Sequence, residues 1–62
     1  MNRKLNMLRY LVQSNSFTKI GELATVFNVT TRTVRNDLLV IEEYLKGTKA
    51  ELVKKKGHGV II

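Results

Sequence analysis

The sequence predicts an α+β fold in which three helices are followed by a β-hairpin. Apolar residues recur at helical spacing up to about residue 46, in three segments separated by polar residues. The last segment, "AELVKKKGHGVII", instead has short runs of strand-forming residues on either side of two glycines. With 62 residues, the chain is expected to form a single domain, residues 1–62, with a small hydrophobic core.

The first helix is expected at about residues 2–13. Asn2 can cap its N-terminus, and the polar run at residues 14–16 ends it. The apolar positions of this helix are Leu5, Leu8, Leu11 and Val12.

The second helix is expected at about residues 18–27, with Thr18 as its N-cap. Asn28 follows it, and asparagine tolerates the left-handed backbone conformation that often ends a helix. A short extended piece at residues 16–18 is a further candidate, as a third strand of the sheet. The apolar stripe of the second helix consists of Ile20, Leu23, Ala24 and Phe27.

The third helix is expected at about residues 31–46, with Thr30 as its N-cap and Gly47 at its end. After it, the hairpin is expected at about residues 50–62, with its tip near Gly57. The inward stripe of the third helix consists of Val34, Leu38, Ile41 and Leu45.

Composition narrows the class of function. The net charge of +6 and the pI of about 10.1 indicate a polyanionic partner, either nucleic acid or an acidic membrane surface. No apolar run approaches the roughly 20 residues that span a bilayer, and the N-terminus lacks the pattern of a signal peptide. We therefore expect a cytoplasmic protein without membrane contact.

The inventory of reactive residues argues against an enzyme. The chain has no cysteine and a single histidine, His58, so neither a thiolate site nor a structural zinc site is expected. It also lacks a nucleophile–base pair, a carboxylate dyad and a glycine loop that could cradle phosphate. No catalytic residue, metal or cofactor is predicted.

The second and third helices and the turn between them have the features of a helix-turn-helix. Such a motif needs a small residue where the helices cross, a residue that tolerates positive φ in the turn, an apolar anchor and a capping hydroxyl. The sequence supplies these in order, as Ala24, Asn28, Val29 and Thr30.

In this motif the second helix enters the major groove of duplex DNA, and residues of its first turns reach the bases. Arg32 and Asn36 are the candidates for base edges, because arginine pairs with guanine and asparagine with adenine. Thr31 and Arg35 are expected to divide between bases and backbone, and Thr33 can add a hydroxyl donor. These five side chains lie outside the inward stripe.

The hairpin adds a second candidate contact through Lys54, Lys55, Lys56 and His58. Lysines beside a glycine-flanked tip can follow a phosphate backbone or enter the minor groove. The alternative is that the lysines protect the edge of a small sheet, and the two roles can coexist. His58 is expected to be an exposed turn residue or a phosphate contact.

The segments "GELATVFNVTTRTVRNDLLVIEEYL" and "ELVKKKGHGVII" resemble the N-terminal winged helix-turn-helix domain of bacterial transcriptional activators of sugar operons. These activators carry phosphotransferase-system regulation domains. The resemblance implies the DNA-reading part of a longer regulator, and it covers nearly the whole chain. The positions that match the DNA-contacting positions of that family are Thr31, Arg32, Thr33, Arg35, Asn36, Lys55, Lys56 and His58.

Several alternatives stay open at the level of sequence. A winged helix can instead bind another protein, although an acidic surface would suit that role better than the basic one expected here. Asp37 could orient Arg35 or lysine side chains, or it could be solvent-exposed. Leu39 and Val40 lean outward, either partly covered by lysine or wing side chains or free to dock a missing domain or a second copy. A homodimer is thus a further expected possibility.

Overall fold

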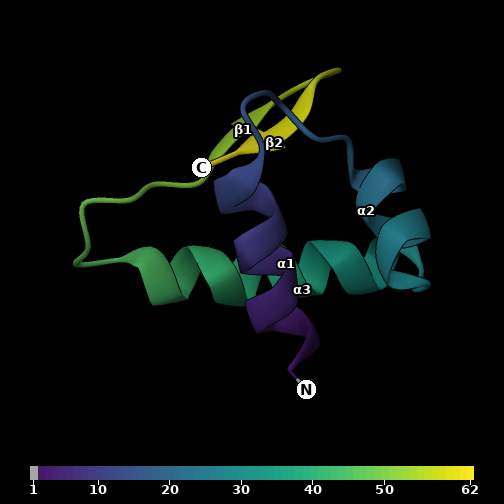
Figure 1. Ribbon diagram of the computed structural model, residues 1–62, viewed down its shortest axis with the longest axis horizontal. Helices are drawn as coiled ribbons and strands as arrows, with labels where there is room; N and C mark the ends of the chain where they lie inside the picture. Colours follow the sequence, from purple (N-terminus) through teal and green to yellow (C-terminus); the bar gives the residue numbers. More distant parts are fainter. Residues whose placement is uncertain (1) are drawn as a thin grey trace.

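The computed structural model describes residues 2–62, so Met1, the first residue of the expected domain, lies outside the described residues. Three helices precede a two-stranded antiparallel sheet (Figure 1). This order is the predicted α+β winged helix-turn-helix. The elements are α1 (Arg3–Gln13), α2 (Ile20–Phe27), α3 (Thr31–Leu45), β1 (Val53–Lys55) and β2 (Gly59–Ile61).

The predicted helices α1 and α3 are confirmed together with their caps. The Asn2 side chain accepts hydrogen bonds from the amides of Lys4 and Leu5, and it thereby satisfies free donors of the first turn of α1. Thr30 does the same for α3 by accepting from the Thr33 amide. Gly47 follows α3 with a φ of 83°, a conformation that glycine adopts without strain.

The expectation that Thr18 caps α2 is wrong. Lys19 stands at the N-cap position, no side chain caps the helix, and α2 begins at Ile20. Thr18 is only 3% exposed, and its amide and carbonyl pair with those of Val60 at 2.8 and 2.9 Å. Because both backbone groups are used in this bridge, Thr18 is held extended as the third-strand contact that the sequence had raised at residues 16–18.

Side chains from all three helices and from the hairpin region meet in one core. α3 crosses α1, α2 lies over the N-terminal end of α3, and β2 packs against α1 (Figure 1). All four residues of the predicted α3 stripe are buried, which confirms the helical period of that segment. The buried apolar residues are Met7, Leu11, Leu23, Val34, Leu38, Ile41, Leu45, Leu52 and Val60.

Within residues 2–62, no helix is long and apolar enough to cross a membrane.

Candidate nucleic-acid interface

The turn between α2 and α3 has the geometry that the sequence predicted. Asn28 lies in the left-handed region with φ 54° and ψ 49°. The amide of Val29 donates to the carbonyl of Ala24 at 3.0 Å, which folds the chain back at the end of α2. Val29 and Ala24 are half-buried against the core, so the turn anchors α3 at its N-terminal end.

The first turn of α3 combines a capped end with free donors. Thr30 Oγ1 accepts from the Thr33 amide and donates to Thr33 Oγ1, both at 3.1 Å. The amides of Thr31 and Arg32 have no carbonyl one turn earlier in the helix, and they lie at the positive end of its dipole. An anion such as a phosphate is favoured at this end.

The predicted contact residues of α3 lie on the N-terminal half of the helix, outside the buried stripe. Thr31, Arg32, Arg35 and Asn36 are exposed. Thr33 is half-buried, and its hydroxyl is partly engaged by Thr30. The C-terminal half of α3 is acidic instead, so a polyanion is attracted to one half of the helix only.

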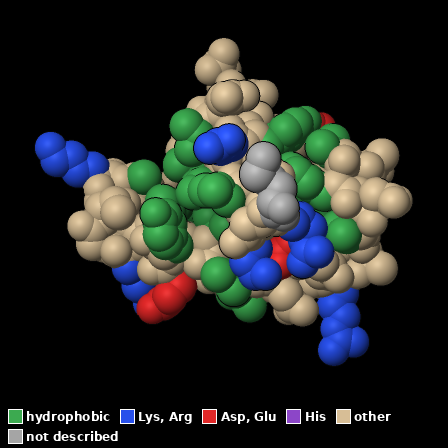
Figure 2. All heavy atoms as spheres, turned by 60° about the horizontal axis from the view of Figure 1, so that its bottom comes forward, with side chains coloured by type: hydrophobic (Ala, Val, Ile, Leu, Met, Phe, Trp, Pro, Cys, Tyr) green, Lys and Arg blue, Asp and Glu red, His purple; other side chains and the backbone are tan. Residues whose placement is uncertain are grey.

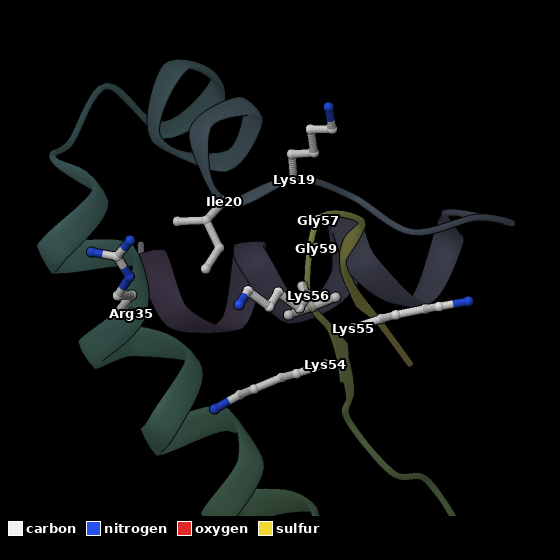
Figure 3. A pocket seen from close by; sticks show the side chains of 9 residues that line it. Lys19, Ile20, Arg35, Lys54, Lys55, Lys56, Gly57 and Gly59 are labelled. Carbon is white, nitrogen blue, oxygen red and sulfur yellow. The ribbon is translucent and has the colours of Figure 1, made fainter.

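A basic cleft of about 560 Å³ lies between the start of α2, the middle of α3 and the hairpin (Figure 3). Five of its lining side chains are lysine or arginine and none is acidic. The cleft joins predicted contacts of α3 to predicted contacts of the hairpin, which are far apart in the sequence. Its lining residues are Lys19, Ile20, Arg35, Lys54, Lys55, Lys56, Gly57, Gly59 and Val60.

The hairpin lysines point in two directions, as alternation along a strand requires. Lys54 and Lys56 extend toward α3, whereas Lys55 extends to the other side (Figure 3). Lys54 Nζ lies 3.6 Å from Glu42 Oε1 of α3, and both side chains are exposed by more than 40%. A surface pair of this kind stabilises little, about 0–1 kcal/mol, so it leaves Lys54 able to exchange Glu42 for a phosphate.

His58 is exposed in the turn of the hairpin, as predicted. Its amide donates to the Lys55 carbonyl at 3.0 Å, which closes the turn. Its ring lies 6.1 Å from that of Phe17, centroid to centroid, at a tilt of 53°. The imidazole ring thus lies beside Phe17, at the tip of the hairpin.

Lys19 was not among the residues predicted from the sequence. It immediately precedes α2, and its side chain is exposed beside the basic cleft. The signal that could have found it is its place before a helix N-terminus, where free amides and the helix dipole favour an anion. Because the sequence analysis placed the N-cap of α2 at Thr18, it did not recognise Lys19 as the residue at the helix N-terminus.

The structure also decides between the two interpretations of Asp37. The residue is 2% exposed, so solvent exposure is excluded. Its carboxylate accepts from Arg3 Nε at 2.6 Å and from Arg3 Nη2 at 3.2 Å, and Lys4 Nζ lies at 3.5 Å. The hydrogen bonds from Arg3 lower the pKa of Asp37, and burial opposes this effect only in part. Asp37 therefore joins α3 to α1. Of the partners predicted for it, it pairs with a lysine, Lys4, and not with Arg35.

Leu39 and Val40 are 57% and 49% exposed. Both therefore lean outward, as predicted.

Comparison with protein families identifies a family that the chain matches. A family model described as "HTH domain" matches residues 3–61, a range that runs from the first residue of α1 to the last residue of β2. Comparison with curated proteins and with solved structures gave no match. Helix-turn-helix domains place their second helix in the DNA major groove, so the match indicates DNA binding. On this match, and with the turn and helices in the required arrangement, the chain belongs to the helix-turn-helix domain family.

Proposed function

We propose that the chain binds duplex DNA with sequence preference, through the N-terminal half of α3 and the basic cleft. The observation that supports the proposal is that these two surfaces adjoin each other and share Arg35. Arg35 belongs to both, because it projects from α3 and lines the cleft with the hairpin lysines. A groove-reading helix with a basic channel beside it matches a duplex, which offers bases in a groove flanked by phosphates.

Each group has a role that follows from its chemistry. Arg32 and Asn36 read base edges, since both are exposed on the outer side of α3. Thr31, Thr33 and the free amides of the first turn bind the phosphate nearest the helix end. The cleft binds the phosphates that follow along the strand, through Lys19, Arg35, Lys54, Lys55 and Lys56. His58, which lies in the hairpin turn outside the cleft lining, adds a further phosphate contact.

The resemblance to regulators of sugar operons extends the proposal. On that basis the chain is the DNA-reading part of a transcriptional regulator of carbohydrate utilisation, joined to regulatory domains. The α3 residues of the resemblance include Arg32 and Asn36, which are proposed to read the bases, so a defined operator sequence is expected. The sequence recovered by selection from random duplexes would serve to find the operon.

A protein-interaction module is the competing proposal, and the charge of the surface argues against it. The five cations of the cleft have no acidic neighbour in its lining. A protein partner would need a matching acidic surface, whereas any duplex offers one.

Selection of duplex sites by the 62-residue chain, followed by quantitative binding, tests the proposal. We expect enrichment of one short motif and binding of that motif at least about tenfold tighter than random duplex. Enrichment of no motif, together with binding that salt does not weaken, would refute DNA reading in favour of protein docking.

Lys19→Ala with Lys49→Ala as its control tests the part played by the cleft. Both lysines are exposed, and both changes lower the net charge equally, but Lys49 lies outside the cleft. We expect Lys19→Ala to weaken the binding of selected and random duplexes by a similar factor, and more than Lys49→Ala does. Equal effects of the two variants would mean that only the net charge matters.

A further inference from the structure

A second surface, separate from the basic cleft, lies between α1 and α3. It is a groove of about 220 Å³ lined by Asn2, Lys4, Leu5, Leu8, Val40, Ile41 and Tyr44, and we call it the α1–α3 groove. It continues into a shallow hollow formed by Leu39, Val40, Glu43 and Tyr44. Figure 2 views the molecule toward the N-terminal end of α1 and shows hydrophobic side chains gathered there, with charged groups at their edges.

The groove and the adjoining hollow expose several large apolar side chains. Tyr44 is 70% exposed, and Leu5, Leu39 and Val40 are each exposed by more than 40%. These four are among the seven large apolar side chains exposed in residues 2–62. A contiguous apolar surface with a polar rim is typical of an interaction site, whereas single exposed apolar residues need no explanation.

The two helices that flank the groove carry opposite charge along their length, although Lys4 is the only charged residue in the groove lining itself. The charged residues of α1 are Arg3, Lys4 and Arg9, and α1 contains no acidic residue. From Asp37 to its end, α3 contains three acidic residues and no basic one. Arg3 and Lys4 already pair with Asp37, which ties the two walls together.

Two further charges of opposite sign, Arg9 of α1 and Glu43 of α3, are exposed near the groove. Arg9 lies one turn after Leu5 on the same side of α1, is exposed, and forms no ion pair within residues 2–62. Glu43 lines the hollow, and its pair with Lys46 joins two side chains that are each 72% exposed. Such a pair exchanges partners at little cost in free energy.

From this arrangement we propose that the α1–α3 groove binds a second copy of the chain, related by a two-fold axis. A two-fold axis through the groove sets α1 of one copy against α3 of the other, and the contact occurs twice. Arg9 of each copy then meets Glu43 of its partner, and Val40 and Tyr44 are covered by the partner's apolar side chains. A second copy fits the charges of the flanking helices, because it places basic α1 against the acidic half of α3 twice.

The dimer leaves the DNA-reading surface open. Arg32 and Asn36 are on the N-terminal half of α3, and the groove uses the C-terminal half, from Leu39 to Tyr44. Self-association is a property of the protein alone and does not rest on DNA binding. A dimer that also binds DNA would present two reading helices to two half-sites.

Sedimentation equilibrium of the 62-residue chain without DNA, at about 10 µM to 1 mM, tests the proposal over the range expected of a small interface. We expect a monomer–dimer equilibrium. Val40→Lys should raise the dimer dissociation constant at least about tenfold, because it places a charge in the apolar contact. Val26→Lys on α2 is the matched control, since Val26 is 48% exposed and Val40 49%, and it should leave the dimer unchanged.

Charge reversal separates a second copy from any other occupant. Arg9→Glu and Glu43→Lys should each weaken the dimer about three- to tenfold, and the chain carrying both changes should regain the original association. Circular dichroism verifies that each variant folds. A monomer throughout the concentration range, an equal loss with Val26→Lys, or a double variant as weak as the single ones would each overturn the proposal.

Discussion

Asp37 is an acidic residue next to the basic segment of α3, and its role is explained by its contact with α1. It directly follows the arginine-rich segment of α3, yet it is buried and accepts two hydrogen bonds from Arg3 of α1. Buried charges are stable only when they are paired and hydrogen-bonded, and both conditions hold here. The pair fixes where α1 crosses α3, and therefore how the reading helix is held.

We predict that Asp37→Asn destabilises the fold in a pH-dependent way. The folded-state pKa of Asp37 is lowered, so its contribution is complete above the unfolded-state value of about 3.9 and is lost as pH falls through the folded-state value. Urea unfolding at several pH values gives the free energy of unfolding of both proteins. The difference between the two free energies should be large at pH 7 and should shrink below about pH 4. A difference of constant size would mean that the charge of Asp37 does not stabilise the fold.

A substitution of Arg32 tests whether a single side chain of α3 contacts a base. Arg32 is exposed on the outer side of α3 and is absent from the lining of the cleft. We predict that Arg32→Ala loses about 1–3 kcal/mol of binding to the selected duplex and much less to random duplex, because a base contact is specific. Fluorescence anisotropy on both duplexes measures this, with Lys49→Ala as the control. Unchanged affinity for both would remove the base-contact role.

At the scale of elements, the helices and the hairpin follow from local patterns, whereas the bridge that joins the hairpin to Thr18 does not. α1 and α3 begin within one residue of their predicted starts because a capping side chain precedes each. α2 has no such side-chain cap, and its start was placed too early. The bridge between Thr18 and Val60 joins residues 42 positions apart, and no local pattern specifies that pairing.

Gly59 is the residue on which that bridge depends. Its φ is 103°, and a Cβ atom built on it would lie 2.0 Å from the carbonyl oxygen of Thr18. The hairpin can therefore approach residue 18 only if position 59 lacks a side chain. Gly57 also has a positive φ, of 82°, but a Cβ there meets nothing within 4 Å.

We predict that Gly59→Ala costs more than about 2 kcal/mol of unfolding free energy, since a backbone clash is added to the strain of positive φ. Gly57→Ala should cost about 1–2 kcal/mol, the strain alone. Chemical unfolding of the two variants followed by circular dichroism gives the comparison. Equal losses would show that the approach of the hairpin to Thr18 contributes nothing.

At the scale of the whole molecule, the charge of +6 is not spread evenly. The cleft gathers five cations, whereas Glu42 and Glu43 lie toward the other end of α3. Such an asymmetry orients a polyanion before any specific contact forms, because its field extends about 10 Å at 0.1 M salt. The molecule thus has a DNA-attracting side and a C-terminal half of α3 left free for another contact.

We predict a steep salt dependence of duplex binding. If about five phosphates are neutralised, the logarithm of the affinity should fall with the logarithm of salt concentration at a slope of about −4 to −5. Lys55→Ala should weaken all duplexes about equally and flatten that slope by about one. A slope near zero for the unchanged chain would contradict an interface made with phosphates.

The sequence by itself determined the elements and the inward face of α3, because amphipathic period, caps and the tolerance of Asn28 for positive φ act over a few neighbouring residues. It was wrong about part of α1, where the predicted apolar positions Leu5 and Val12 are exposed and Met7 is buried instead. It also indicated the exposed residues of α3, which lie outside the apolar stripe. Only the tertiary structure decided the partner of Asp37, the place of Lys19 in the cleft and the pairing of Thr18 with Val60. Each of these contacts joins separate elements, and its geometry is set by how the helices pack around the core.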